Sequence, residues 1–388
     1  MSQDVQSEKV IVVEYADLLS DATTPDMISA LSSAFGGEAS LGLLAIRGVP
    51  HFVEARDALL PRAHGLAHLP ADYLEENLTD PASLYNAGWS HGKERMGDSP
   101  DLAKGSFYFN PLTDLPGTEE DRARYPASYP SNLWPGEGVL PGFEGEAKIL
   151  GRIAREAVVV LSRHIDAYAR SMVGDGYPPN LLHDAMRRTD KAKGRLLYYF
   201  PLVESGDGEG GERDSVVEDS WIGWHNDSGF LTALVGELYM DDATGRALDP
   251  SSGSDDGPDP AAGLYVVGRS GETPVRVDIP RECLAVQIGE CTQIVTGGAV
   301  VATPHCVRGA AGRRGGARVA RISCPCFVDT APTFPLRFPE GADRADVLNA
   351  GVGHDRVPPL GERWTHDGMK FGDFLGKTFE TYYTWSKK

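Results

Sequence analysis

The sequence predicts an α+β protein with a mainly β core. From about residue 194 to residue 328 the chain consists of short β-rich runs that are separated by turn residues. Many short strands divided by turns are typical of an antiparallel sandwich or barrel rather than a parallel sheet. Residues 144–173 place apolar side chains on one broad helical face, and residues 371–388 predict a capping helix with an aromatic face. We therefore expect helical elements on both sides of a β core.

The other elements follow from local patterns. KVIVVEY at 8–14 and LGLLAIRGVP at 41–50 predict strands, and residues 25–36 and 52–67 predict helices. Residues 76–145 have no clean period and predict mostly irregular structure. The β-rich runs are 195–201, 221–240, 263–270, 274–280, 284–289, 292–298 and 317–328.

We expect one compact unit with three regions. A mixed helix and strand region over 1–193 would pack on a β core over 194–330, and an extension over 331–388 would carry the capping helix. Two acidic insertions rich in Gly, Ser and Pro, at 203–219 and 241–262, predict surface loops. Such loops either close over a site when substrate binds or are inert insertions.

The composition is that of a soluble globular protein and disfavours several partners. Of the 388 residues, 41% are hydrophobic and 24% are charged. The sequence has no run of 18 apolar residues, so we expect no membrane span. The polar start MSQDVQSEKV does not resemble a secretory signal, and the five cysteines are an odd number. We therefore expect a cytoplasmic protein, monomeric or homodimeric, without a disulfide framework. The net charge of -19 disfavours nucleic acid and membrane surfaces as partners.

Two histidines and one carboxylate form a candidate metal site. His225 and Asp227 are two residues apart in a strand-like run, so alternation places both on one face and turns Trp224 away from it. His305 follows a Thr-Pro turn after a further β-rich stretch. Two imidazoles and a carboxylate leave metal positions open for O2 and a chelating co-substrate, which is typical of non-haem iron(II). Without the third residue, His225 and Asp227 would be a satisfied polar pair at a strand end.

Two other groups are weaker metal candidates. His64 and His68 have i,i+4 spacing, but no third ligand is identifiable, and a solvated helix face is the simpler interpretation. Cys324 and Cys326 lie in a strand run with no matching second pair. We expect both cysteines to be small buried strand residues.

The order of these motifs resembles that of the isopenicillin N synthase-like family of iron(II)/2-oxoglutarate-dependent oxygenases, over most of the chain. LGLLAIRGVP is similar to the family's amino-terminal strand and His-Gly-Val-Pro turn, RLLYYFP to its Asn-x-Tyr-Pro strand, and WHNDSGFLTAL to its His-x-Asp strand. LAVQIGECTQIVTGG resembles its Asn-x-Gly-Asp segment, TPHCVRG its distal-histidine turn, and Arg321-Ile322-Ser323 its Arg-x-Ser motif. The resemblance implies a double-stranded β-helix, or jelly-roll, core.

The resemblance also implies roles for individual residues. The ligands of Fe(II) would be His225, Asp227 and His305. Arg321 would pair with the distal carboxylate of 2-oxoglutarate, with hydrogen bonds from Ser323 and Tyr199. A guanidinium matches a carboxylate in shape and charge, and one buried arginine would supply local positive charge in an acidic protein. The alternatives are a surface strand arginine for Arg321 and an ordinary core tyrosine for Tyr199.

Two departures from the family pattern concern the co-substrate. Leu197 stands where the family has Asn in the Asn-x-Tyr strand, which removes one polar contact. His305 and Arg321 are 16 residues apart, a longer spacing than is common in the family, with AAGRRGGA as an enlarged turn. Arg308 is a rival carboxylate partner, although we place it on the turn and out of register with Ser323.

The substrate contacts are the least specific prediction. KGSFYFNPL at 104–112 offers Tyr108 and Asn110, and Phe327 could wall the pocket, but each could equally be structural. The resemblance implies oxidation of a small molecule, of amino-acid-derived or specialised-metabolite type, by hydroxylation, desaturation or oxidative cyclisation. O2 would be a co-substrate and ascorbate a reductant. The alternatives are an oxidase like the family's namesake, which does not use 2-oxoglutarate, and a non-catalytic jelly-roll binding protein.

Overall fold

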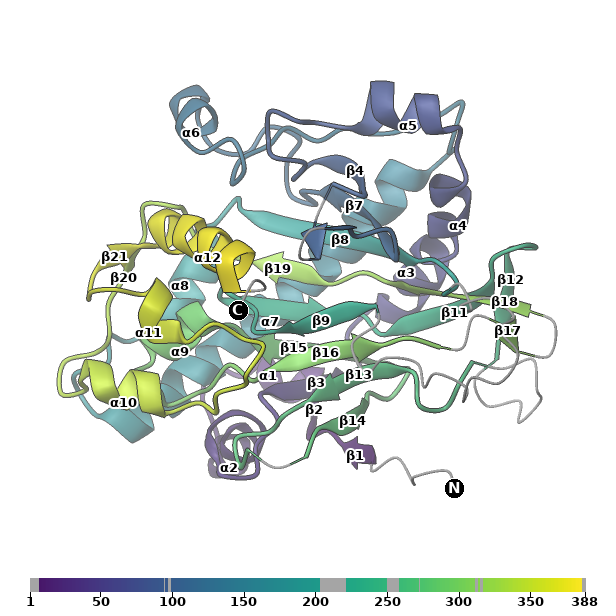
Figure 1. Ribbon diagram of the computed structural model, residues 1–388. Helices are drawn as coiled ribbons and strands as arrows, with labels where there is room; N and C mark the ends of the chain where they lie inside the picture. The colour runs from purple at the N-terminus through teal and green to yellow at the C-terminus, as the bar shows by residue number, and fades with distance from the viewer. Residues whose placement is uncertain are drawn as a thin grey trace.

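In the computed structural model, two β-sheets form the core of the molecule (Figure 1). The structure describes residues 7–93, 95–96, 99–202, 221–249, 258–271, 273–310, 313–314 and 317–385. Within these residues the strands of the larger sheet are β2 (Val12–Glu14), β3 (Leu43–Arg47), β4 (Gly88–His91), β7 (Lys104–Phe109), β8 (Ala192–Tyr199), β10 (Leu231–Leu234), β11 (Glu237–Asp241), β12 (Arg246–Leu248), β15 (Cys283–Ile288), β17 (Arg313–Arg314), β18 (Ala317–Ser323) and β19 (Cys326–Val328). Their order is β12-β11-β18-β8-β19-β10-β15-β3-β2, with β7 and β4 continuing from β8 and β17 beside β18.

The smaller sheet lies opposite the larger one. Its described strands are β1 (Ser7–Lys9), β9 (Ile222–His225), β13 (Gly263–Val266), β14 (Val275–Asp278) and β16 (His305–Arg308), in the order β1-β14-β13-β16-β9. These neighbours pair antiparallel, except for the parallel pair β1 and β14. Side chains of both sheets line one shared cavity, so the sheets enclose it between them. Two facing, largely antiparallel sheets are the architecture of a jelly roll.

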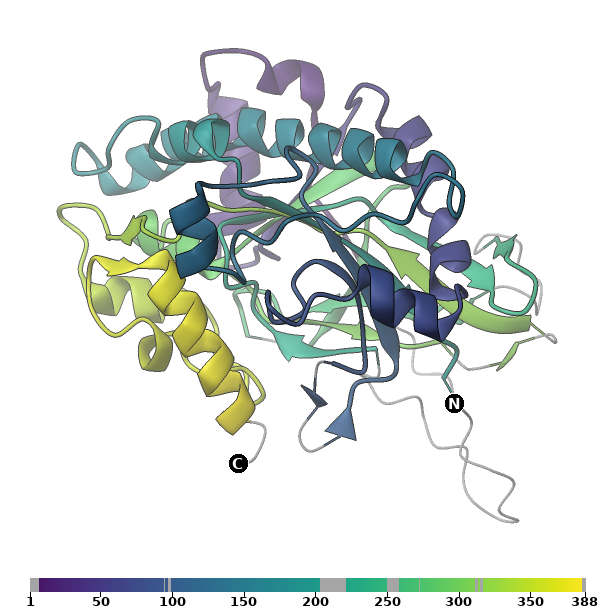
Figure 2. The ribbon, with the colours of Figure 1, turned by 90° about the horizontal axis from the view of Figure 1, so that it is seen from above.

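One long helix covers the outer face of the larger sheet. α7 (Phe143–Val173) buries an apolar stripe that includes Leu150, Ala154 and Leu161. It contacts β8, β10, β15 and β19, and Figure 2 shows it running across the sheet. Burial of this stripe against the sheet explains its position. The described helices on the amino-terminal side of the core are α1 (Tyr15–Leu18), α2 (Pro25–Leu31), the π-helix η1 (Ser32–Gly36), α3 (Phe52–Leu59), α4 (Arg62–Ala67), α5 (Ala71–Leu78), α6 (Glu119–Arg124) and α8 (Leu181–Arg188).

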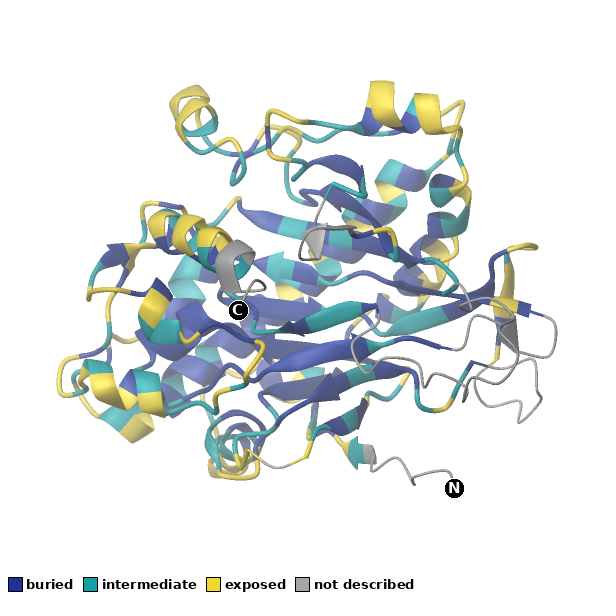
Figure 3. Ribbon diagram, in the orientation of Figure 1, coloured by how far each residue is buried: buried dark blue, intermediate teal, exposed yellow. Residues whose placement is uncertain are grey.

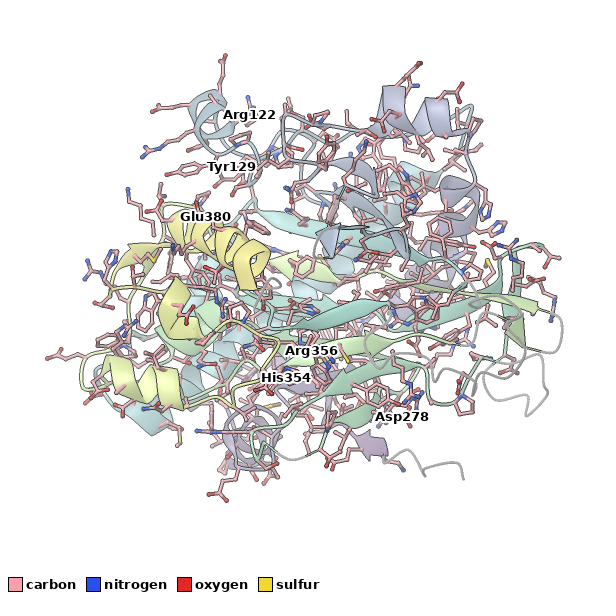
Figure 4. All side chains as sticks on the ribbon, viewed as in Figure 1. Arg122, Tyr129, Asp278, His354, Arg356 and Glu380 are labelled. Carbon is pink, nitrogen blue, oxygen red and sulfur yellow. The ribbon has the colours of Figure 1, made fainter. Side chains whose placement is uncertain are left out.

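We call residues 331–385 the C-terminal lobe. It contains α10 (Arg344–Asn349), α11 (Leu360–Arg363), α12 (Phe371–Trp385) and the strand pair β20 (Pro335–Leu336) and β21 (Met369–Lys370). The lobe packs on β9 through Trp224, which is buried against Val357 and is turned away from the cavity, as alternation predicts. The Trp224 ring also stacks on His354, labelled in Figure 4, with ring centroids 4.4 Å apart.

Burial follows this layered arrangement. Figure 3 shows the buried residues concentrated in the two sheets, and β7 and β15 are buried along their whole length. By contrast, α6 has no buried residue. None of the helices that the structure describes is long and apolar enough to cross a membrane.

The fold class and the two strongest helices are confirmed. α7 coincides with the helix predicted at 144–173, and α12 begins at Phe371 as predicted. The described residues of 76–145 are mostly irregular, as predicted, but the segment also contains β4, β7 and α6, which we did not predict. β7 pairs with β8 in the middle of the larger sheet. Because both of its faces are buried, its sequence shows no alternation that would reveal a strand.

The run at 292–298 is not the strand that we predicted. It belongs largely to the helix α9 (Glu290–Val295). Thr, Ile and Val favour a strand locally, but the amides of Gly289 and Cys291 bond to carbonyls of Phe230 and Gly229, and this tertiary context overrides propensity. The elements predicted at 8–14, 25–36 and 52–67 are each divided in two. Of the acidic insertions, residues 203–219 and 250–257 lie outside the described residues, so their role as lids stays a prediction.

Candidate metal centre and co-substrate pocket

His225 and His305 lie side by side on neighbouring strands. They are register partners at the ends of β9 and β16, and their ring centroids are 4.2 Å apart. Asp227 Oδ1 lies 3.9 Å from His225 Nε2 and 3.8 Å from His305 Nε2. The candidate ligand atoms of the three residues all lie within 4.8 Å of one another. The three side chains can therefore share one metal ion.

Backbone carbonyls define the tautomer of both imidazoles. His225 Nδ1 is 2.8 Å from the carbonyl oxygen of Gly223, and His305 Nδ1 is 3.1 Å from that of Thr303. Because a carbonyl oxygen only accepts, each Nδ1 carries the hydrogen and each Nε2 keeps a lone pair on the side of Asp227. Gln287 Nε2 lies 2.9 Å from His305 Nδ1, and the Gln287 amide accepts from the Nδ1 hydrogen when its oxygen is turned to this position. Metal-binding histidines are commonly held in this way.

The charge state also suits a cation. Burial and the adjacent His305 ring lower the pKa of His225 to about 4, so its imidazole is neutral near pH 7. Two imidazole nitrogen donors and one carboxylate, without a thiolate, match the donor set of non-haem iron(II). The site accordingly fits this metal on the chemistry of its donors.

Asp227 is not positioned by strand alternation, which corrects our prediction. β9 ends at His225, and Asp227 belongs to the irregular segment that follows. Its carbonyl accepts a hydrogen bond of 2.8 Å from the amide of Glu290 at the start of α9. The neighbouring amides of Cys291 and Gly289 donate to the carbonyls of Gly229 and Phe230. Asp227 is therefore held by the start of α9, a helix whose residues 292–295 we had assigned to a strand.

The three residues open onto a cavity of about 520 Å³ between the two sheets. Four of the side chains predicted from the sequence line the same cavity, namely Tyr199, Arg321, Ser323 and Phe327. Arg321 and Ser323 lie opposite Tyr199 and Leu197 in the pairing of β18 with β8. The residues expected to bind a metal and a co-substrate thus share one cavity with Phe327, and Leu197 leaves an apolar wall where the family has Asn.

Tyr108 and Asn110 are not among the residues that line this cavity. The Tyr108 ring lies beneath the guanidinium of Arg195 and the ammonium of Lys193, at 5.1 Å and 5.6 Å. The Asn110 side chain donates to the carbonyl of Asp190 and accepts from the amides of Leu112 and Thr113. These contacts favour structural roles for both residues, and the substrate role that we expected for them stays a prediction.

Arg321 is buried rather than a surface strand arginine. Its Nε donates to Glu237 Oε2 at 2.7 Å, and its guanidinium carbon lies 4.9 Å from the centroid of the Tyr199 ring. Burial opposes its charge, but Glu237 and the two neighbouring tyrosines raise the pKa of Arg321 above its ordinary value. Among the described residues its Nη1 is buried without a hydrogen-bond partner. A buried donor of this kind needs an acceptor, which a bound carboxylate would supply.

Arg308 is a weaker candidate for that carboxylate. It lies within β16 opposite Gly263, and not on a turn as we predicted. It is half-buried and is not among the residues that line the cavity. Arg321 is therefore the better placed of the two arginines.

Several polar residues of the cavity wall were not predicted from the sequence, among them Arg195, Glu237 and Gln287. Arg195 Nε donates to Ser106 Oγ at 3.0 Å. A signal existed for Arg195, because it alternates with Leu197 and Tyr199 along β8 and so shares their face. No local signal existed for Glu237 or Gln287, whose partners are Arg321 and His305.

The competing metal candidates are not supported. Cys324 and Cys326 are buried free thiols, as expected, and burial raises the pKa of Cys326 to about 12. His64 Nε2 lies 2.9 Å from the carbonyl of Asp242, and His68 Nδ1 lies 2.8 Å from that of His64. In the part of the chain that the structure describes, the group of three candidate ligands is the one at His225.

Comparisons with known proteins bear on the fold. No family model and no curated sequence matches the chain. The chain is similar to a protein from Caulobacter crescentus assigned to the 2OG-Fe(II) oxygenase family, at 18% identity and a TM-score of 0.62, over 96% of this chain and 98% of that one. It is also similar to a full-length Neurospora crassa protein solved in complex with alpha-KG, at 16% identity and a TM-score of 0.61, over 94% of each chain.

A third similar structure is JOX2 in complex with 2OG, Fe and JA, at 15% identity and a TM-score of 0.60, over 97% of this chain and 87% of that one. At such identities the likeness establishes the fold. The chain thus has the jelly-roll fold of the 2OG-Fe(II) oxygenases, as the sequence motifs indicated.

Proposed function

We propose that this protein is an Fe(II)/2-oxoglutarate-dependent oxygenase that oxidises a small molecule. One observation carries the proposal. The Nε2 atoms of His225 and His305 and the carboxylate of Asp227 converge in a cavity that also contains a buried arginine with an unpartnered Nη1. A metal site and an anion site in one enclosed space are what a chelating dicarboxylate requires.

Each residue would have a defined task. His225 and His305 would hold Fe(II) through their Nε2 atoms, and Asp227 would offset part of its charge. Arg321 would bind the distal carboxylate of 2-oxoglutarate through Nη1, with Ser323 and Tyr199 beside it. The apolar side chains of Ile222, Leu264 and Val307, which line the cavity, would exclude water from the reacting groups. The bound iron would supply the activation of O2 for oxidation of the substrate.

The size of the cavity supports a small-molecule substrate. About 520 Å³ lies within the usual range of small-ligand pockets. Similar structures have been solved with thymine and with JA. We propose an amino-acid-derived or specialised metabolite, with Phe327 in the cavity wall beside it and hydroxylation, desaturation or oxidative cyclisation as the outcome. O2 would be consumed, and ascorbate would serve as a reductant.

A second candidate function is an oxidase that does not use 2-oxoglutarate. The contact between Arg321 Nε and Glu237 favours it, because an internal carboxylate already neutralises the proposed anchor. A non-catalytic binding protein is disfavoured, because it would not need three converging ligand side chains.

Substrate screening separates these functions. Purified protein with Fe(II), O2 and 2-oxoglutarate is incubated with a panel of small metabolites, and succinate formation is measured. The proposal predicts succinate formation that a substrate stimulates and that His225→Ala abolishes. Substrate-dependent O2 consumption without any need for 2-oxoglutarate would instead establish the second function.

A further inference from the structure

A buried ion pair joins the C-terminal lobe to α9. Arg363, the last residue of α11, is 0% exposed, and Glu290, the first residue of α9, is 1% exposed. The two guanidinium Nη atoms donate to the two carboxylate oxygens, and Nη2 also donates to the carbonyl of Pro358 at 2.9 Å. Both groups are enclosed, and the pair is bidentate.

The same glutamate contacts the chain between two of the candidate metal ligands. Glu290 Oε1 accepts a hydrogen bond of 3.1 Å from Asn226 Nδ2. Its amide donates to the carbonyl of Asp227 at 2.8 Å. Asn226 stands directly between His225 and Asp227, so one residue of α9 holds the short connection on which both ligands lie. The amide of Asn226 also lies 3.4 Å from the hydroxyl of Tyr382 in α12.

Stability alone does not account for this arrangement. Enclosing an ion pair costs desolvation, and well-packed apolar residues of similar volume are often equally stable or more stable. Asn226 adds a further cost, because its Oδ1 is buried without a partner among the described residues. An apolar residue at position 226 would avoid that cost. The hydrogen bonds from Arg363 through Glu290 to Asn226 are therefore better explained by a need to orient Asn226.

We propose that Glu290, clamped by Arg363, is a positioning residue that holds Asn226 and thereby sets the separation of His225 and Asp227 at the metal. This inference rests on the proposed metal site, and it makes the C-terminal lobe part of the metal-binding structure. Trp224, packed against Val357 and His354, ties the lobe to the other side of the same strand end. The lobe thus reaches both neighbours of His225.

The test uses the full chain and Co(II), which has visible absorption bands that report ligand geometry. Asn226→Leu removes the link without leaving an unpaired charge. We expect it to weaken Co(II) binding by about 10- to 100-fold, the usual effect of losing a partner of a metal ligand, and to shift the visible bands. Its melting temperature without metal should stay within a few degrees of wild type. The double variant Glu290→Leu/Arg363→Met, which removes both charges and the acceptor for Asn226, should show the same shifted spectrum.

The matched control is Asp166→Asn. Asp166 is a buried carboxylate that accepts hydrogen bonds from Tyr177 and the start of α8, and it does not line the cavity. This variant should lose stability but keep wild-type Co(II) affinity and bands. If Asn226→Leu binds Co(II) with wild-type affinity and an unchanged spectrum, the positioning role is wrong while the metal site stands. If wild-type protein binds no Co(II), the proposed metal site itself fails.

Discussion

His225 and His305 are register partners, and each ring turns its Nδ1 hydrogen toward the carbonyl two residues earlier in its own chain segment. This symmetrical arrangement favours the same tautomer in both rings, and both Nε2 atoms lie within 4 Å of Asp227 Oδ1. Preorganised donors lower the cost of ordering a site on binding. The role of each of the three residues in metal binding can therefore be tested separately.

Replacing His225, Asp227 or His305 with Ala should abolish Fe(II) binding and leave the fold intact. The strand ladders of β9 and β16 are made by backbone groups and do not depend on these side chains. Metal content after anaerobic loading and the melting temperature of the metal-free protein measure the two effects. His68→Ala, a change at an exposed histidine, should retain wild-type metal content. Full metal binding by any one of the three variants would remove that residue from the site.

The sequence correctly predicted that the three candidate metal ligands lie together, but it gave the wrong structural cause for the position of Asp227. The His-x-Asp spacing and His305 identified three side chains that do lie together. Strand alternation was the wrong explanation for Asp227, because its position depends on hydrogen bonds to α9, more than sixty residues later. Thr292, Ile294 and Val295 favour a strand by local propensity, and only tertiary hydrogen bonds make this segment a helix.

Contacts between distant residues of the cavity wall could likewise not be predicted from local sequence. Arg321 and Ser323 were recognisable from their motif, whereas Glu237 could not be paired with Arg321 from local sequence. Tyr108 was chosen as a polar side chain in an amino-terminal segment, and this does not reveal whether such a side chain lines the cavity. The Asn110 side-chain oxygen accepts hydrogen bonds from backbone amides two and three residues later, so it stabilises its own turn.

Arg321→Lys should weaken 2-oxoglutarate binding strongly. An ammonium cannot reproduce the directed hydrogen bonds of a guanidinium, and losing a partly buried charged pair costs about 2–5 kcal/mol, roughly 30- to several-thousand-fold in affinity. Anaerobic calorimetric titration of the Fe(II)-loaded protein measures the change. Arg308→Lys is the control and should change the affinity much less, because Arg308 is not among the residues that line the cavity. A larger effect of Arg308→Lys would move the anchor to β16.

Glu237→Gln should tighten 2-oxoglutarate binding by about tenfold. The carboxylate of Glu237 contacts Arg321 Nε at 2.7 Å, so an incoming carboxylate meets a like charge several Å away. At the effective dielectric constant of a protein, such a repulsion is worth about 1–3 kcal/mol. The amide keeps an acceptor for Nε while removing the charge. Glu282→Gln, a change at an exposed glutamate, should have no effect. Weaker binding by Glu237→Gln would show instead that Glu237 orients the guanidinium.

Lys193 should make stability depend on pH. Burial, together with Lys191 and Arg195, lowers its pKa from 10.5 to about 7. Between these two pH values the folded chain binds fewer protons at this site than the unfolded chain, so the free energy of unfolding rises as the pH increases from about 7 toward 10.5. Lys193→Met should remove this rise and be more stable than wild type at pH 6. Urea denaturation at pH 6, 7.5 and 9 measures it, with exposed Lys377→Met as the control. An unchanged pH slope in Lys193→Met would contradict the prediction.

The central claim is that one cavity binds Fe(II) and 2-oxoglutarate together. An anaerobic titration of the purified chain with Fe(II) and then with 2-oxoglutarate tests it directly, because the iron chelate has a weak visible charge-transfer band. We predict that the band appears with one Fe(II) per chain, saturates with 2-oxoglutarate, and is absent from Asp227→Ala. Protein that binds Fe(II) but gives no band at saturating 2-oxoglutarate would contradict the claim.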